Sequence, residues 1–176
     1  MNQNVVVIGG GPAGIEASRK LRDLGYTPIL IESQPALGGK LTRWDRLFPD
    51  GVEARAILDP MLQDLDGIKY FTDTEVLSIN RLKDTWVVKL SNGLSAQVRA
   101  ILLTTGFDLF KAEKKEEYGY GIYERVITNA DLEDWYKSGA PLQFDNVHTI
   151  GFVHCVGSRD EKAGNRQGSE GGWVTA

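Results

Sequence analysis

A glycine-rich hexapeptide near the start of the chain, Gly-Gly-Gly-Pro-Ala-Gly beginning at Gly9, has the residue types and spacing most suited to chemistry. It fits the dinucleotide-binding pattern G-x-G-x-x-G. In that pattern Gly9 permits a tight turn, Gly11 lets the backbone approach a pyrophosphate, and Gly14 lets a helix pack closely on a strand. Pro12 and Ala13 lie where the hexapeptide opens the expected helix, and the free N–H groups at that helix end face the anion. The hexapeptide therefore predicts a site for the pyrophosphate of a dinucleotide.

An acidic residue follows at the spacing that this pattern requires. Glu32 lies 18 residues after Gly14, at the end of the second expected strand. A carboxylate at this place accepts hydrogen bonds from ribose hydroxyls, and its charge repels a 2′-phosphate. NADP is therefore disfavoured, whereas NAD and FAD remain open. A glycine-rich turn that binds no ligand is the alternative interpretation of the same residues.

The expected secondary structure places the hexapeptide between a strand and a helix, which is the position where this pattern binds a pyrophosphate. Residues 5–8 form a β-branched run typical of a buried strand, and residues 27–31 give a second strand. Between them, residues 13–24 carry apolar side chains at helical spacing, and Gly25 can end the helix. This order of strand, helix and strand predicts a parallel βαβ unit.

Later segments predict how the sheet continues. A helix is expected over residues 53–65, kinked or split by Pro60, and a buried strand over residues 101–105. Asn92-Gly93 favours a type I′ hairpin turn. The β-rich runs between helix and strand are residues 68–72, 75–79, 85–90 and 94–98. We therefore expect an α/β fold, a Rossmann-type parallel sheet of FAD/NAD(P)-binding topology with an inserted antiparallel β-meander.

The composition excludes several other classes of function. The chain has 176 residues, a net charge of -4 and a pI near 5.2, the wrong sign for binding nucleic acid through bulk electrostatics. One cysteine and two histidines make neither an intramolecular disulfide nor a complete zinc site, so we expect no metal. No apolar run approaches a membrane span and no export signal is evident, so we expect a cytoplasmic protein without direct membrane insertion.

The segment after Glu32 helps to separate FAD from NAD. The eight residues from Glu32 resemble the E-x5-G-G extension of two-dinucleotide-binding-domain flavoproteins. In those proteins the glycine pair, here Gly38 and Gly39, lies near the FAD pyrophosphate and the ribityl chain. Ser33 and Lys40, which belong to the same stretch, are included in the expected cofactor site, although a solvated position is an equally good interpretation of Lys40. From the residue types alone, Gly38-Gly39 indicates only a turn, because glycine adopts backbone conformations that other residues avoid.

A third motif follows the expected meander. Thr104-Thr105-Gly106 resembles the "ATG" motif that the same flavoproteins carry at this point, and implies that Thr105 and Gly106 belong to the cofactor site. Val76 resembles the position whose backbone meets the adenine. Three matched motifs in the correct order favour FAD over NAD as the cofactor.

The resemblance can be narrowed to the A subunit of heterodisulfide reductase, with the A subunit of the quinone-interacting membrane-bound oxidoreductase also similar. Its most specific part is the Cys-Val-Gly-Ser-Arg-Asp stretch that begins at Cys155. The segments that carry it are residues 38–49, 104–110, 115–121 and 154–161. This family implies an FAD-dependent oxidoreductase that passes electrons among flavin, iron–sulfur clusters and thiol or quinone partners. Electron-transfer partner subunits are therefore expected.

The chain departs from the family pattern at its cysteines. Glu53 and Ala56 stand where many members have a Cys-x-x-Cys pair, and residues 166–173 replace a cysteine-rich cluster loop. Cys155 is the single thiol, so no four-cysteine 4Fe–4S site can form within one chain. A buried, inert thiol is the favoured interpretation of Cys155. No other side chain is an evident acid, base or nucleophile, so the cofactor itself would carry the redox step.

The resemblance also implies a division of the chain. We expect an FAD-binding domain over residues 1–145, while residues 146–176 form the start of a second nucleotide-binding domain or a C-terminal tail. Residues 147–156 are the expected first strand of that second part, and Asn129 is expected to cap a short helix before it. The chain is thus expected to be a shortened flavoprotein that keeps the ADP-binding half. The alternatives are a non-catalytic or degenerate dinucleotide-binding or subunit-interaction module, and an NAD-binding domain.

Overall fold

The structure, a computed structural model, describes residues 3–139 and 147–157. The chain divides into two compact units, Met1–Gly106 and Phe107–Ala176. All residues of the predicted cofactor site belong to the first unit. The predicted domain boundary after residue 145 falls on residues outside the described ranges and stays a prediction.

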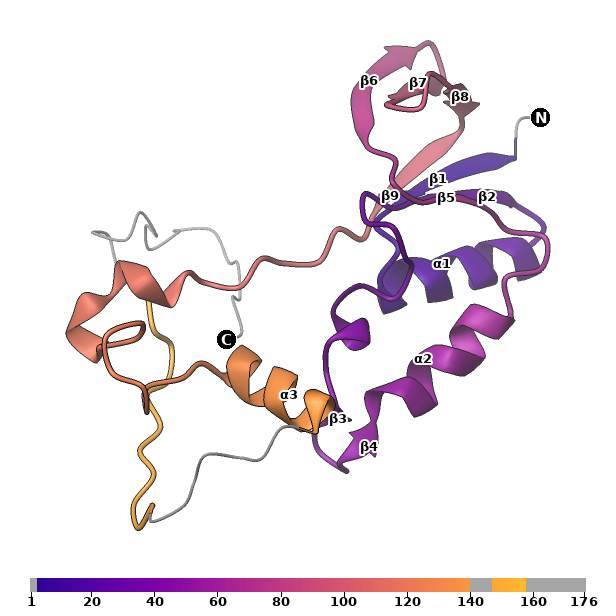
Figure 1. Cartoon of the computed structure of the whole chain (residues 1–176). Coiled ribbons are helices and arrows are strands. Elements are labelled where there is room, and N and C mark those ends of the chain that lie inside the picture. The colour runs from indigo at the N-terminus through magenta and orange to yellow at the C-terminus, as the bar shows by residue number, and fades with distance from the viewer. Residues whose placement is uncertain (1–2, 140–146, 158–176) are drawn as a thin grey trace. The chain divides into compact units, whose positions relative to one another are not determined.

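A four-stranded parallel sheet forms the centre of the first unit (Figure 1). Its strands are β1 (Asn4–Ile8), β2 (Thr27–Ile31), β5 (Lys69–Phe71) and β9 (Ala100–Leu103). They lie in the order β5-β2-β1-β9, and every pairing is parallel. This arrangement confirms the predicted Rossmann-type sheet, in which the strand order reverses at β1.

Both faces of this sheet are covered, as the continuous apolar strands predicted. Val7 packs in a core shared with the helices, whereas its neighbour Val6 packs in a second core shared with the meander. Successive side chains of a strand point to opposite faces, so one strand supplies both cores. The strand that leads into the glycine-rich segment is thereby packed on both faces.

Two helices cover one face of the sheet. α1 (Pro12–Asp23) ends before Gly25, which has a left-handed φ of 84°, as predicted. α2 (Ala54–Gln63) is one helix across Pro60, so of the predicted kink or split the split does not occur, and the kink stays a prediction. Pro60 lies in the last turn, where a proline removes a hydrogen bond at the end of the helix rather than in its middle. The connection from β2 to α2 contains η1 (Gly39–Thr42), β3 (Arg46–Leu47) and β4 (Val52–Glu53).

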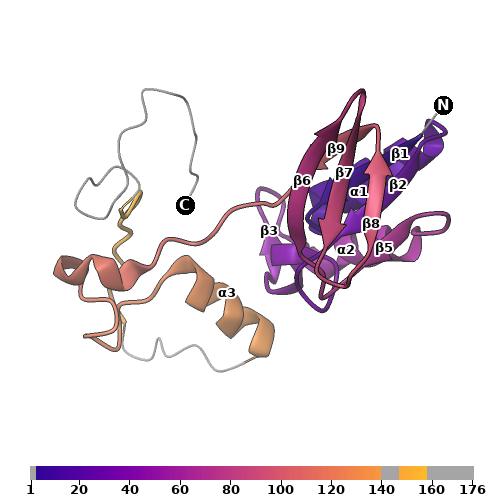
Figure 2. The same ribbon diagram turned by 90° about the horizontal axis from the view of Figure 1, so that it is seen from above.

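The other face is covered by the antiparallel meander, which lies across the sheet when it is viewed from above (Figure 2). Its strands are β6 (Val76–Leu82), β7 (Thr85–Leu90) and β8 (Ser95–Val98), in the order β6-β7-β8. The meander is inserted between β5 and β9, as predicted.

The predicted type I′ turn between β7 and β8 is wrong. Gly93 has a positive φ of 84°, but Asn92 does not. The Gly93 N–H donates to the Leu90 carbonyl at 3.1 Å, and the Asn92 side-chain oxygen accepts from the Leu94 N–H at 3.1 Å. A three-residue loop needs a left-handed residue only at its last position, so the same dipeptide makes a different turn.

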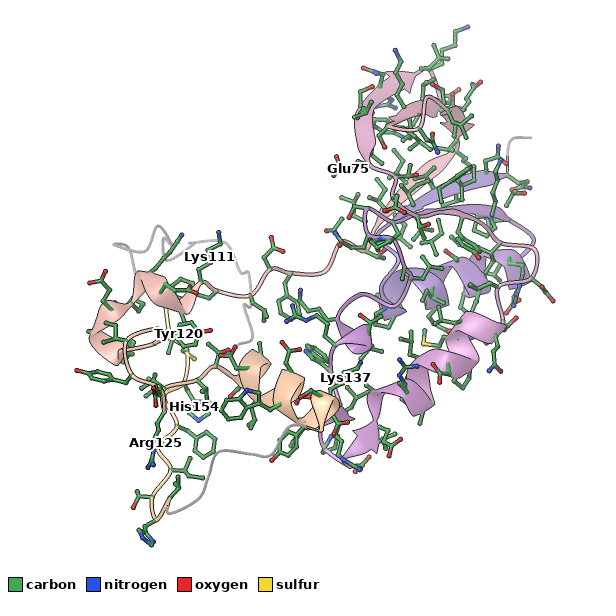
Figure 3. The ribbon with its side chains drawn as sticks, in the orientation of Figure 1. Glu75, Lys111, Tyr120, Arg125, Lys137 and His154 are labelled. Carbon is green, nitrogen blue, oxygen red and sulfur yellow. The ribbon has the colours of Figure 1, made fainter. Side chains whose placement is uncertain are left out.

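The second unit has short elements: η2 (Ala112–Lys114), η3 (Glu116–Tyr118) and α3 (Asn129–Ser138). The N-cap of α3 is Thr128 rather than the predicted Asn129, because the Thr128 hydroxyl and the Asp131 carboxylate form a reciprocal capping box. Tyr120, labelled in Figure 3, donates its hydroxyl to Asp131 at 3.3 Å. Burial and the adjacent carboxylate raise the pKa of Tyr120.

The predicted strand over residues 147–156 is absent from the described part of the chain, where residues 147–154 have no regular structure. A strand exists only where a neighbour supplies hydrogen-bond partners, and in the described residues this segment pairs with no strand. Cys155 is exposed, so the expectation of a buried thiol is also wrong.

Candidate functional site

The site lies at the carboxyl ends of β1 and β2, where the glycine-rich turn joins β1 to α1. Gly9 starts this turn with a left-handed φ of 108°, and its N–H donates to the Ile31 carbonyl at 2.8 Å. A Cβ added at Gly9 would lie 2.3 Å from the Thr104 carbonyl oxygen. Both the backbone conformation and the packing therefore require glycine here.

Gly14 is required by contact with the same turn. A Cβ at Gly14 would lie 1.9 Å from the Gly9 carbonyl oxygen, well inside any tolerable contact. The absence of a side chain lets α1 pack directly on the end of β1. The structure thus shows the close approach of helix and strand for which the spacing of the motif predicted a glycine.

Gly11 differs from both of these glycines. It is the N-cap of α1, with an ordinary φ of -72°. A Cβ added there would meet nothing nearer than the Gly39 Cα, at 4.0 Å. Neither strain nor packing within the described residues therefore requires glycine at this position. The open space beside Gly11 fits a group from outside the protein that approaches the backbone closely.

The electrostatics of this opening suit an anion. Pro12 is the first residue of α1, no side chain caps the helix, and its first turn has no acidic residue. The leading N–H groups of a helix, here including those of Ala13 and Gly14, lack acceptors within the helix. Together with the helix dipole they favour negative charge. The donor set therefore fits a pyrophosphate.

The second glycine pair lies against the first. The Gly38 N–H donates to the Gly10 carbonyl at 2.7 Å, and a Cβ at Gly39 would lie 3.0 Å from the Gly11 Cα. Both glycines have positive φ values, 115° and 53°. Lys40, partly exposed in η1, follows them directly. Two motifs separated in the sequence thus form one continuous backbone surface.

Glu32 is buried and braces the glycine-rich turn. One carboxylate oxygen accepts the Gly10 N–H at 2.6 Å, and the other accepts the Gln34 N–H at 2.7 Å and the Ser33 hydroxyl at 3.2 Å. Glu32, the predicted ribose-binding residue, therefore also stabilises the glycine-rich turn without any ligand. The sequence pattern did not predict Gly10 as the donor to Glu32, although the fixed spacing of glycines and acid along βαβ units is a signal for this contact.

The remaining predicted residues lie near the same edge. The Thr104 N–H donates to the Ile8 carbonyl at 2.8 Å, directly before exposed Thr105 and left-handed Gly106. Val76 begins β6 and is partly buried in the meander core. The chain reaches it from Thr74, whose N–H donates to the Glu32 backbone carbonyl at 2.9 Å. The structure therefore brings the third motif to the turn, and Val76 lies two residues after Thr74, which bonds to the Glu32 backbone.

Neither a metal-binding cluster nor a membrane-spanning helix occurs in the part of the chain that the structure describes. These residues contain no group of three or more His, Cys, Asp or Glu side chains that could hold a metal ion. None of their helices combines the length and apolar character needed to cross a membrane.

Comparison with known proteins identifies the family. The family model for pyridine nucleotide-disulphide oxidoreductases matches residues 3–132. The chain belongs to this family. The matched residues include the glycine-rich turn, Glu32, the second glycine pair and the meander, and the family supports a flavin or nucleotide cofactor.

Within the pyridine nucleotide-disulphide oxidoreductase family, the chain is similar to curated proteins of heterodisulfide reductases. The A subunit of the H(2)/formate:CoB-CoM heterodisulfide,ferredoxin reductase of Methanococcus maripaludis is 40% identical, over 94% of this chain and 39% of that protein. One iron-sulfur A subunit of the CoB--CoM heterodisulfide reductase of Methanopyrus kandleri is 24% identical, over 91% of this chain and 38% of that protein. The chain therefore spans well under half the length of these relatives.

A solved structure supports the fold. The L-proline dehydrogenase from P. horikoshii superimposes with a TM-score of 0.52 and 26% identity, covering 58% of this chain and 22% of that protein. The expected resemblance to the A subunit of heterodisulfide reductase and the predicted Rossmann-type fold are both confirmed.

Proposed function

We propose that this chain binds FAD and serves as an oxidoreductase or electron-transfer subunit similar to the A subunit of heterodisulfide reductase. The observation that carries the proposal is the open space at Gly11, a glycine that neither the conformation nor the packing of the described residues demands. Membership of the pyridine nucleotide-disulphide oxidoreductase family supports a flavin or nucleotide in that space. Bound FAD would supply the reversible uptake of electrons.

Each part of the ADP half of FAD has an assigned contact in this proposal. The N–H groups at the start of α1 hold the pyrophosphate, with Gly38 and Gly39 forming the opposite wall. Glu32 accepts hydrogen bonds from the ribose hydroxyls. It already accepts bonds from Gly10, Gln34 and Ser33, and a carboxylate has about four acceptor sites, so one acceptor site remains for a ribose hydroxyl.

The outer contacts of the cofactor complete the assignment. The Val76 backbone meets the adenine, and Lys40, Thr105 and Gly106 lie on the path towards the ribityl chain. Since the names of the relatives describe subunits of heterodisulfide reductases, we propose that this chain also works beside partner subunits. A cytoplasmic location is part of the same proposal.

The test is an absorbance spectrum of the purified protein in the visible range, before and after incubation with FAD and desalting. We expect flavin bands at about one FAD per chain, and we expect Gly11→Ala to lose them because its methyl group occupies the space of the pyrophosphate. A colourless wild-type protein that also fails to bind ADP by calorimetry would contradict the proposal. A colourless protein that binds ADP would favour the alternative of a non-catalytic dinucleotide-binding module.

A further inference from the structure

The side chain of Thr104 joins the end of β9 to the glycine-rich turn. The Thr-Thr-Gly motif predicted a role for Thr105 and Gly106, but none for this side chain. Its hydroxyl oxygen lies 2.9 Å from the carbonyl oxygens of both Ile8 and Gly9, so its proton can be donated to either. Its backbone N–H donates to the Ile8 carbonyl at 2.8 Å. The contact spans 95 positions of sequence, and both segments lie in the first unit.

The peptide group between Gly9 and Gly10 is held at both of its polar ends. Its carbonyl oxygen, on Gly9, lies within hydrogen-bond distance of the Thr104 hydroxyl. Its N–H, on Gly10, donates to the Glu32 carboxylate at 2.6 Å. Because a peptide group is planar, a bond at each end fixes the orientation of the whole plane. One bond comes from the end of β9 and the other from the end of β2.

The orientation of this plane determines the direction of the backbone that follows it. The next residue is Gly11, where the chain enters α1 and faces the proposed pyrophosphate. Gly14 also packs against the Gly9 carbonyl, and a Cβ there would lie 2.8 Å from the Thr104 hydroxyl oxygen. Rotation of the peptide would therefore disturb both the packing of α1 and the donors of its first turn.

We propose that Thr104 is a positioning residue for nucleotide binding: its hydroxyl, together with the Glu32 carboxylate, fixes the Gly9–Gly10 peptide and hence the anion-binding turn. This inference rests on the proposed nucleotide-binding function. Thr104 touches no part of the bound group in this assignment. It acts through the Gly9 carbonyl, and its loss removes the side-chain hydrogen bond at that end of the peptide.

The experiment compares Thr104→Val, which removes the hydroxyl at nearly constant shape, with Thr104→Ser, which keeps it. The matched control is Thr85→Val, because Thr85 donates its hydroxyl to the Leu82 carbonyl at 2.9 Å in the meander, away from the turn. The dissociation constant for ADP is measured by isothermal titration calorimetry, with urea unfolding to confirm that each variant is folded. We expect Thr104→Val to weaken ADP binding about tenfold, the cost of one lost bond at a constrained site. Thr104→Ser and Thr85→Val should bind like the wild type.

A second readout needs no ligand. In ¹H–¹⁵N spectra of the ligand-free protein, Thr104→Val should shift the amide signals of Gly10 and Gly11 and speed their exchange with solvent, whereas Thr85→Val should not. Unchanged glycine signals would overturn the inference whether or not ADP binds. Equal ADP affinity of folded Thr104→Val and wild type would also overturn it. Failure of the wild type to bind ADP or FAD would instead contradict the proposed function, and the amide signals would still decide the role of Thr104.

Discussion

The glycine-rich turn has an inward side and an outward side, and its glycines are needed for different reasons on each. On the inward side, a side chain at Gly9 or Gly14 would collide with backbone atoms at 2.3 and 1.9 Å. On the outward side, a side chain at Gly11 would meet nothing nearer than 4.0 Å. Gly9 and Gly14 are required by the fold, whereas the open space at Gly11, at the N-terminus of α1, fits a ligand. This contrast makes separable predictions for stability and for binding.

Gly14→Ala should have the largest effect on stability. The added methyl group overlaps the Gly9 carbonyl oxygen, a backbone atom that can move only with the end of β1. We expect a loss of about 3 kcal/mol or more in the free energy of unfolding, measured by urea denaturation. Gly25→Ala is the control, because its new methyl group meets nothing within 4 Å and only the left-handed φ of 84° is strained. If Gly14→Ala lowers the free energy of unfolding no more than Gly25→Ala does, packing does not require glycine at position 14.

Gly11→Ala should reverse this pattern. As an N-cap glycine replaced by alanine, it should cost about 1 kcal/mol of stability or less. Its affinity for ADP should fall at least about tenfold, because the methyl group competes with the pyrophosphate for the opening of α1. Calorimetric titration with ADP and urea denaturation give the two quantities. Unchanged ADP affinity would remove the distinction between the two sides of the turn.

Ser18→Ala should make the protein slightly more stable. Ser18 is fully buried on α1, and its hydroxyl finds no hydrogen-bond partner among the residues that the structure describes. Removal of an unsatisfied buried hydroxyl should raise the free energy of unfolding by about 1 kcal/mol. The change lies on the packed side of α1, so ADP affinity should stay constant. A destabilised variant would indicate that the hydroxyl has a partner after all.

Asp64→Asn should have the smallest effect, and one that depends on pH. Arg22 and Arg19 of α1 donate hydrogen bonds to the Asp64 carboxylate after α2, which lowers its pKa from 3.8 to about 2. This stabilisation is present above the unfolded pKa of 3.8 and is lost as the pH falls towards 2. Between pH 3.8 and about 2, we expect the wild type to lose the stability that the ionised Asp64 carboxylate provides. Asp64→Asn has no carboxylate at this position and should show no such loss.

Urea midpoints measured from neutral pH down to that range provide the test of the Asp64 pair. Asp59→Asn, a change at an exposed position of α2, serves as the control. Parallel pH profiles for wild type and Asp64→Asn would contradict the assignment. The ion pairs are open to solvent and therefore screened, so the difference at neutral pH should be small.

Local patterns were sufficient for most of the first unit. The spacing of Gly9, Gly11 and Gly14 placed the turn, and apolar periodicity placed the strands and helices to within a few residues. Errors occurred where several conformations suit the same residues, as at Asn92 and Asn129. The expected strand over residues 147–156 failed for another reason: strand formation depends on a neighbour that the segment itself does not encode.

The sequence by itself determined the βαβ unit, the insertion of the meander and the residue types at the proposed nucleotide site. Only the tertiary structure decided that Gly39 lies against Gly11 and that Glu32 and Thr104 hold the two ends of one peptide group. These contacts join segments that are far apart in the sequence. They depend on the order and register of the parallel strands, which no local pattern specifies, because each strand of a buried sheet is apolar on both faces and can pair with any other.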